Sequence, residues 1–247
     1  MNPEIQQVLD GASDGCIVCG DCLEVMAEMP DGCVDLVLTD PPYGIHITKK
    51  ANQYGRSTHL SRKATRDRWD DVPLSTIQVA ELTRVSRNQI VFGANYFWPL
   101  FSETKCYIVW DKRGSLPDVP FAPTELAWTS FDRMPRHYTI INHGFITDMS
   151  EPRKLHPTQK PQLLMSRIVV DFTDVSALIL DPFCGSGTTC VAAKMLGRRY
   201  IGIDISSDYV AIARKRLEAV DTGVPVKERD AGQLPLFTGH DGESDGS

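Results

Sequence analysis

One stretch, residues 177–204, constrains the fold more than any other part of the chain. It predicts a buried strand at residues 177–181, a glycine-rich turn, a helix at residues 188–196 and a second strand at residues 200–204. Ser206 or Ser207 then caps a last helix that runs to about Val220. Such a unit belongs to a parallel sheet, and the acid that ends its second strand, Asp204, is suited to ribose hydroxyls. The stretch therefore predicts an α/β chain with a ligand site at the carboxyl edge of its sheet.

The turn itself differs from two common nucleotide-binding loops. It reads Asp-Pro-Phe-Cys-Gly-Ser-Gly-Thr-Thr from Asp181 to Thr189, without the third glycine of a dinucleotide fingerprint and without the lysine of a phosphate-binding loop. Asp181 would repel a pyrophosphate, but it could pair with a cation such as the methionine ammonium of S-adenosylmethionine. The turn therefore favours a ligand of that kind.

The remaining elements are consistent with one α/β core. Apolar runs predict strands at residues 16–19, 34–38, 89–93, 107–110 and 125–128, and helices are expected at residues 20–26, 73–87 and from Pro161 to beyond Phe172. Residues 1–15 read as a loosely held segment, and residues 130–157 show no strong element. We expect a single domain at residues 1–220 and a flexible acidic tail at residues 221–247.

A second chemical signal follows the predicted strand at residues 34–38. Asp40, Pro41, Pro42 and Tyr43 place a carboxylate and an aromatic ring on a stiff turn, because two prolines fix φ and remove two backbone donors. Such a turn could hold a nucleobase by stacking while the carboxylate accepts hydrogen bonds from an exocyclic amino group. A rigid strand exit with Tyr43 packed on the core is the alternative.

Composition excludes several classes of protein. The chain has no apolar segment of membrane-spanning length and no signal-peptide layout, so we expect a cytoplasmic protein without a membrane partner. Seven cysteines, an odd number, favour reduced thiols. Cys16, Cys19 and Cys22 have a spacing seen in metal sites, but a strand would turn Cys16 and Cys19 to opposite faces. We expect no metal.

Charge is distributed unevenly. The chain carries a net charge of −6, yet residues 45–69 hold seven basic residues and one acid, a net +6, which leaves −12 for the remainder. The segment follows the Asp40 turn directly, so it could reach the phosphates of a nucleic acid; a solvated charged loop is the alternative. The candidates for this contact are Lys49, Lys50, Arg56, Arg62, Lys63, Arg66 and Arg68.

Three motifs together resemble one family. With Asp-Pro-Pro-Tyr at residues 40–43, His-Pro-Thr-Gln-Lys-Pro at residues 156–161 and the glycine turn after them, the chain resembles the beta group of DNA amino-methyltransferases. In that group the catalytic motif precedes the cofactor motif. The resemblance runs from about Gly20 to Leu217 and implies a Rossmann-like S-adenosylmethionine-dependent methyltransferase fold with a mostly parallel sheet, helices on both faces and a permuted motif order.

The resemblance also implies roles for individual residues. Asp40, with Pro41, Pro42 and Tyr43, would be catalytic, and Asp204 would hold the ribose. Asp21 and the Cys22 backbone would contact the adenine of S-adenosylmethionine, and Thr158 and Lys160 would lie by its methionine end, although Lys160 could instead be a surface cation. The remaining cofactor residues would be Asp181, Phe183, Gly185, Ser186, Gly187, Thr188 and Thr189.

The implied reaction is methylation of a base amino group in double-stranded DNA. Asp40 and the Pro41 carbonyl would accept hydrogen bonds from the two N–H groups of the amino group, so that its lone pair can attack the methyl group in line. The base would be flipped out of the duplex and stacked on Tyr43. An Asp in the first motif position is more frequent in adenine-N6 enzymes, which favours adenine over cytosine N4. A catalytically silent DNA-binding regulator on the same fold is the alternative from another class.

Two further stretches bear on partners. The region at residues 130–156 is short for target recognition, which predicts a very short or degenerate site and favours a solitary or phage-type methylase over half of a stringent restriction pair. Residues Gln233–Phe237 resemble a peptide that docks on the bacterial sliding clamp, or they fold back on the domain. The sequence leaves open whether the protein is a monomer or a homodimer.

Overall fold

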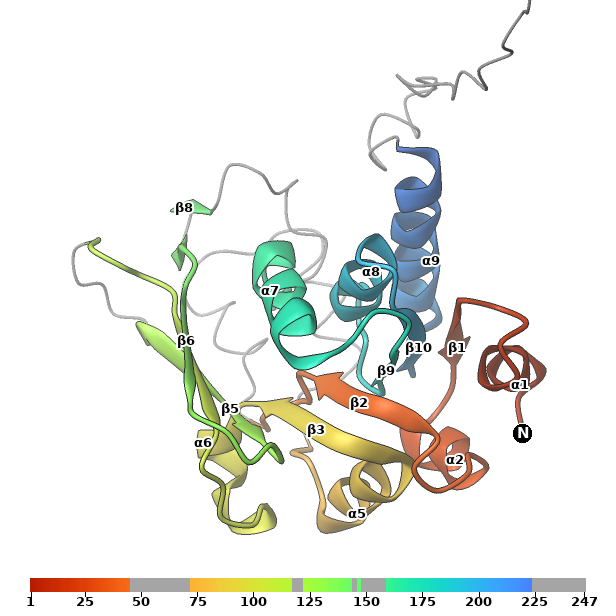
Figure 1. Ribbon diagram of the computed structural model, residues 1–247, viewed down its shortest axis with the longest axis horizontal. Helices are drawn as coiled ribbons and strands as arrows, with labels where there is room; N and C mark the ends of the chain where they lie inside the picture. Colours follow the sequence, from red (N-terminus) through yellow and green to blue (C-terminus); the bar gives the residue numbers. More distant parts are fainter. Residues whose placement is uncertain (45–71, 117–121, 144–145, 148–158, 224–247) are drawn as a thin grey trace, which may run out of the picture.

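A central sheet dominates the structure (Figure 1). The computed structural model describes residues 1–44, 72–116, 122–143, 146–147 and 159–223. Eight strands form the sheet in the order β1-β10-β9-β2-β3-β5-β4-β6. Their bounds are β1 Gly15–Cys19, β2 Val34–Thr39, β3 Ser86–Phe92, β4 Tyr107–Asp111, β5 Thr124–Thr129, β6 Arg136–Thr139, β9 Leu178–Asp181 and β10 Arg199–Asp204. A separate two-stranded ladder joins β7 (Asn142–His143) to β8 (Ile146–Thr147).

The sheet is mostly parallel, as the sequence predicts. Every pair from β1 to β3 in the sheet order is parallel, β5 runs antiparallel to both β3 and β4, and β6 pairs parallel with β4. Leu36 and Val37 of β2 pair with Ile179 and Leu180 of β9. The strand that leads to Asp40 therefore lies beside the strand that ends at Asp181, as expected.

Helices cover both faces of this sheet (Figure 1). One face carries α7 (Gln162–Phe172), α8 (Thr188–Met195) and α9 (Ser207–Thr222), whose apolar side chains pack with Ile179 of β9. The other face carries α1 (Pro3–Leu9), α2 (Cys22–Ala27), α5 (Thr76–Val85) and α6 (Ala94–Phe97), which pack with Leu180. Because neighbouring residues of a strand point to opposite faces, β9 contributes to both cores. In the described ranges, no helix combines the length and apolar character needed to cross a membrane.

A crevice between β2 and β9 follows from the order of the strands. The chain leaves β2 through α5 to β3 on one side, and leaves β9 through α8 to β10 on the other. Two crossovers that run in opposite directions place their helices on opposite faces and open a crevice at the carboxyl ends of the two central strands. This is the position at which sheets of this kind bind ligands.

Three expectations about the fold are wrong. Residues 1–15 are not a loose segment, since Asn2 caps α1 and Ile5 and Val8 of that helix are fully buried. β6 forms in the region from which no strong element was expected, with Tyr138 buried and its hydroxyl donating to Asp171 at 2.5 Å. The strand expected at residues 89–93 begins at Ser86 as β3, so α5 ends at Val85 and is shorter than predicted.

Candidate active site

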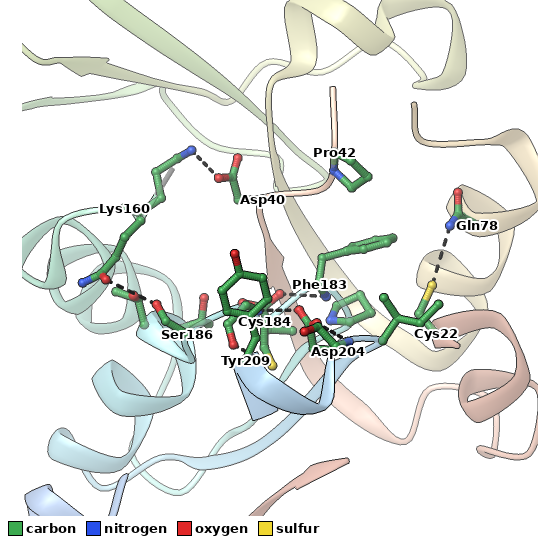
Figure 2. Close-up of a pocket in the computed structure, with 18 of the residues that line it drawn as sticks. Cys22, Asp40, Pro42, Gln78, Lys160, Phe183, Cys184, Ser186, Asp204 and Tyr209 are labelled. Atoms are coloured by element: carbon green, nitrogen blue, oxygen red, sulfur yellow. Dashed lines mark hydrogen bonds and ion pairs between the residues drawn. The ribbon is translucent and has the colours of Figure 1, made fainter. Parts of the chain in front are cut away.

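A cavity of about 470 Å³ lies at the carboxyl edge of the central strands (Figure 2). Its wall includes Asp40 and Pro42 from the turn after β2, Asp181 and Gly185 from the turn after β9, and Asp204 at the end of β10. Small-molecule sites commonly enclose about 300–1,000 Å³. The two motifs, whose first residues Asp40 and Asp181 are 141 residues apart in the sequence, therefore meet at one cavity of ligand size.

The glycine turn is shaped by close packing against α9. Gly187 precedes α8 with φ of +79°, and a Cβ on it would lie 2.8 Å from the Cβ of Ala213. Arg216 of α9 donates to the carbonyl oxygen of Ser186 at 2.7 Å and to the hydroxyl of Thr188 at 3.0 Å. Helix α9 thereby contacts the turn at Gly187 and binds the backbone of Ser186.

Asp204 ties the turn to the end of β10. One carboxylate oxygen accepts a hydrogen bond from the backbone N–H of Gly185 at 2.8 Å, and the other accepts one from that of Ser206 at 2.8 Å. Burial raises the pKa of Asp204, and these two backbone donors counteract part of that rise. A carboxylate oxygen accepts more than one hydrogen bond, so Asp204 can also receive hydroxyl groups from a ligand in the cavity.

Asp181 is buried between β2 and β9, with 4% of its surface exposed. Its carboxylate accepts hydrogen bonds from the Thr39 hydroxyl at 2.7 Å and the Phe183 N–H at 3.2 Å, and it also bonds Thr189. Burial raises the pKa of Asp181 to about 6, because the neutral donors only partly replace water. A cation placed in the cavity would favour its ionised form.

A further part of the wall comes from the start of α2. The side chain of Asp21 caps that helix and accepts from the Leu23 N–H at 2.8 Å. Cys22 is buried, receives a hydrogen bond from Gln78 at 3.6 Å (Figure 2), and burial raises its pKa. Both residues line the cavity, next to Asp204, since the N–H of Gly20 donates to the backbone carbonyl oxygen of Asp204 at 3.0 Å.

The carboxylate of Asp40 has two donors of its own. The Tyr43 hydroxyl donates to one oxygen at 2.5 Å, and the Lys160 ammonium donates to the other at 2.5 Å (Figure 2). The Tyr43 ring stacks on Tyr96 at 4.9 Å between centroids and meets Phe97 edge-on. Tyr43 thus lies behind Asp40 with its ring packed on other aromatic side chains, as in the alternative of a rigid strand exit.

Lys160 lies between two carboxylates. Its ammonium is 2.5 Å from Asp40 Oδ2 and 3.1 Å from Glu125 Oε2, and Lys112 lies 2.9 Å from the other Glu125 oxygen. Burial lowers the pKa of Lys160, but the two carboxylates outweigh that effect and raise it overall. Lys160 is therefore a buried cation and not a surface one; it lines the cavity, with its ammonium bound to Asp40.

The predicted site residues divide into three groups. Those that line the cavity are Asp21, Cys22, Asp40, Pro42, Lys160, Asp181, Phe183, Gly185, Ser186, Thr188, Thr189 and Asp204. Pro41, Tyr43 and Gly187 do not line the cavity, but Tyr43 donates to Asp40 and Gly187 packs against Ala213. Outside the described residues lie Thr158, the clamp-like stretch Gln233–Phe237 and the DNA-binding candidates Lys49, Lys50, Arg56, Arg62, Lys63, Arg66 and Arg68.

Several residues of the site were not found from the sequence. Glu125 appeared only as the first residue of an apolar strand, and Lys112 and Tyr96 had no pattern that singled them out. The charge of Glu125 at the start of a buried strand was the one available signal.

Cys16 and Cys22 are buried while Cys19 is exposed, and the described ranges hold no group of three or more His, Cys, Asp or Glu residues that could bind a metal.

Comparison with known proteins identifies relatives over most of the chain. A family model described as DNA methylase matches residues 101–215. The chain is 30% identical over 236 residues to "Putative methylase YubD" of Escherichia coli (strain K12), with 81% of this chain and 89% of that protein covered.

Solved structures share the fold. The complex of M1.HpyAVI with SAM aligns with a TM-score of 0.53 and 24% identity, covering 82% of this chain and 98% of that one. PvuII DNA methyltransferase, which is cytosine-N4-specific, aligns with a TM-score of 0.57 and 18% identity, covering 89% and 91%. These likenesses confirm the Rossmann-like methyltransferase fold that the sequence predicts.

Proposed function

The chain belongs to the N6/N4 DNA methylase family, and we propose on that premise that it methylates the exocyclic N6 amino group of adenine in double-stranded DNA, with S-adenosylmethionine as the methyl donor. One observation carries the proposal. Asp40, which suits an amino group, and the glycine turn, which suits a nucleoside, line the same cavity. Transfer between two bound groups requires this arrangement, because the reacting atoms must be held close together.

The residues of the cavity fit S-adenosylmethionine. Asp204 can receive the ribose hydroxyls, the wall formed by Asp21 and Cys22 can contact the adenine, and Asp181 can pair with the ammonium of the methionine part. When bound, S-adenosylmethionine supplies a methyl group on a positively charged sulfur, which leaves as a thioether once a nucleophile has taken the methyl group. Phe183 adds an apolar wall beside these polar groups.

Asp40 and the Pro41 carbonyl prepare the nucleophile. The nitrogen of an aromatic amino group shares its lone pair with the ring, so it attacks only when its two N–H bonds are drawn out of the ring plane. Asp40 and the Pro41 carbonyl oxygen each accept a hydrogen bond from one N–H, which draws the hydrogens out of the ring plane. The same two hydrogen bonds stabilise the positive charge that develops on the nitrogen as the new carbon–nitrogen bond forms. The nitrogen then loses one proton, from the N–H that donates to Asp40, and this proton passes by way of the Asp40 carboxylate to solvent.

The position of Asp40 supports base flipping. Its side chain is only 21% exposed and faces a cavity, so an amino group inside a stacked duplex cannot reach it. An extruded base can. We place the base against the face of the Tyr43 ring that Tyr96 does not cover, with Tyr96 holding the ring in position.

The basic segment at residues 45–69 supplies the proposed DNA contact. Its net charge of +6 directly follows the catalytic turn in the sequence. Each phosphate contact releases counterions, so the logarithm of the affinity falls with the logarithm of salt concentration in proportion to the number of contacts. Replacing Arg62, Lys63, Arg66 and Arg68 by glutamine should flatten that slope by about 3 to 4 units. An unchanged slope would remove this segment from the DNA contact.

Mass spectrometry of nucleosides tests the proposed reaction. Unmethylated DNA is incubated with the protein and S-adenosylmethionine, digested and analysed, beside an Asp40→Ala control. The proposal predicts N6-methyladenine that is absent from the control. N4-methylcytosine would keep the mechanism and overturn the base assignment, whereas no methylated base would favour a DNA-binding regulator on the same fold.

A further inference from the structure

We propose that Glu125 is a positioning residue for methyl transfer: through Lys160 it fixes the carboxylate of Asp40 and supplies that carboxylate with a permanent counter-ion. Glu125 belongs to none of the motifs that mark the family resemblance, and no role for it could be predicted from the sequence. The inference rests on the proposed function, because Asp40 is the group that would accept the amino N–H bonds.

The geometry is a chain of alternating charges. Lys112 Nζ lies 2.9 Å from Glu125 Oε1, Glu125 Oε2 lies 3.1 Å from Lys160 Nζ, and Lys160 Nζ lies 2.5 Å from Asp40 Oδ2. The four residues come from four places: the ends of β4 and β2, the start of β5 and the segment before α7. Because it contains two cations and two carboxylates, this group of four side chains has no net charge.

Because the four side chains are largely buried, none of them can leave its partner without a large cost in free energy. The side chains of Lys160, Lys112, Asp40 and Glu125 are 8%, 16%, 21% and 25% exposed. Removing one partner from a buried ion pair leaves an uncompensated charge, which is strongly unfavourable. If Lys160 turned toward the methionine end of a cofactor, Asp40 would lose its cation, and Lys112 alone would remain to neutralise Glu125. The structure therefore favours a Lys160 that stays on Asp40.

Two donors set the orientation of the Asp40 carboxylate. Lys160 binds Oδ2, while the Tyr43 hydroxyl binds Oδ1. A carboxylate has about four acceptor positions, so two remain for the amino group. Glu125 restricts Lys160 in turn, and Phe92 packs under the ammonium at 5.1 Å. The plane of the carboxylate is thereby fixed before any substrate arrives, which is the condition for efficient electrostatic catalysis.

The same groups decide the charge of Asp40, which must be ionised to accept N–H bonds. Burial raises the pKa of Asp40, Lys160 lowers it, Glu125 raises it and the hydrogen bond from Tyr43 lowers it. From β9, Asp181 also faces Asp40, since the charge of Asp40 contributes to the raised pKa of Asp181. Lys160 and Glu125 thus act on Asp40 in opposite electrostatic directions.

That opposition gives a test that a purely structural role would not satisfy. The rate of methyl transfer is measured against pH for Lys160→Met and for the nearly isosteric Glu125→Gln. Lys160→Met should lower the maximal rate by about 100-fold and move the acid limb of the profile to higher pH, because Asp40 loses its cation. Glu125→Gln should lower the rate by about tenfold and move the acid limb to lower pH, because one neighbouring negative charge is gone.

Lys194→Met serves as the matched control. Lys194 forms an ion pair of similar length with Asp221, at 2.6 Å, but this pair joins α8 to α9, is more exposed and does not line the cavity. The control should change neither the rate nor the profile. Affinity for S-adenosylmethionine is measured by calorimetry on the same samples, and the inference predicts that Glu125→Gln and Lys160→Met change it by less than about threefold.

Three results would overturn the inference. A tenfold loss of cofactor affinity in Lys160→Met with an unmoved acid limb would make Lys160 a cofactor ligand. An unchanged rate in Glu125→Gln, or shifts of the acid limb in the same direction in both variants, would remove the positioning role. If Lys160→Met fails to fold, the inference is tested with Glu125→Gln and Lys160→Arg instead. Lys160→Arg keeps the positive charge and is expected to show the acid limb of the wild type.

A measurement without DNA separates this inference from the proposed function. The Asp40 carboxyl group is titrated by ¹³C NMR in the wild type and in both variants. A pKa that rises in Lys160→Met and falls in Glu125→Gln supports the network even if the wild type methylates no DNA, in which case only the proposed function fails. A pKa that does not move in either variant overturns the network.

Discussion

The two halves of the cavity wall are held together differently. The proposed cofactor half, from β9 to α9, is fixed largely by contacts within its own unit, apart from the hydrogen bond of Asp181 with Thr39: Asp204 accepts from the backbone of Gly185, 19 residues earlier. The catalytic half depends on side chains that come from far away in the sequence, since Lys160 reaches Asp40 across 120 residues. The first half is therefore specified locally, whereas the second exists only once the sheet has formed.

The halves also differ in how their acids are neutralised. Asp40 carries a buried ammonium group as its partner, whereas the donors that reach Asp181 in the described part of the chain are neutral. Asp181 is thus suited to a cationic ligand, while Asp40 is suited to a neutral amino group. Substitutions that affect only one of the two halves therefore test whether they act separately.

The largest difference should appear in the pH dependence of stability at Asp181. Because burial raises its pKa from 3.8 to about 6, the folded state holds the proton more tightly than the unfolded chain. Stability should fall as pH rises from about 4 to about 6, by on the order of 3 kcal/mol, and stay level above that range. Asp181→Asn should lose this decline. Urea unfolding at pH 4 to 8 measures it, and parallel curves for the two proteins would contradict it.

Two glycines offer a matched comparison between the halves. Gly93 has φ of +74° and would place a Cβ inside the Tyr43 ring, and Gly187 would place one against Ala213. Each change to alanine should cost about 2 kcal/mol of stability. Gly93→Ala should slow methyl transfer, whereas Gly187→Ala should weaken cofactor binding.

Gly11→Ala is the control for backbone strain alone. Its φ is also +74°, but a Cβ there meets no atom within 4 Å. It should lower thermal stability by about 1 kcal/mol and leave rate and affinity unchanged. Loss of the same property in Gly93→Ala and Gly187→Ala would show that the halves do not act separately.

The smallest effect is expected at Tyr96, which supports the catalytic half by stacking on Tyr43. Tyr96→Leu should cost about 1 kcal/mol of stability and slow methyl transfer a few-fold. Trp98→Leu is the control, because Trp98 stacks at 5.6 Å on Tyr107, away from Asp40. It should lose similar stability without a change in rate. Equal rates in the two variants would contradict a role for Tyr96.

The difference between the halves also explains what the sequence could predict. The bounds of β9, α8 and β10 agree with the expected ones within one residue, because an apolar run, two glycines and a helical stripe lie in one short stretch. Helix α1 was missed although Asn2 caps it and Pro3 begins it, since only Ile5 and Val8 face the core. β6 was missed because Tyr138 is its one buried residue.

The site shows the same division. Asp40, Asp181 and Asp204 could be predicted because each ends a strand, and parallel strands bring their carboxyl ends to one edge. The Lys160–Glu125 contact could not, since no local pattern links an acid on an antiparallel strand to a lysine 35 residues later. The orientation of Tyr43 likewise depends on Tyr96 and Phe97, which only the folded chain brings to it.

One paired measurement tests the central claim, that the catalytic and cofactor halves contribute separately to methyl transfer at one cavity. Cofactor affinity and the single-turnover rate at saturating S-adenosylmethionine are measured for Asp40→Asn and Asp204→Asn. We expect Asp40→Asn to slow transfer by about 10²–10³-fold with nearly unchanged affinity, and Asp204→Asn to weaken affinity by about tenfold with a nearly unchanged rate. Loss of the same property in both variants would contradict the account.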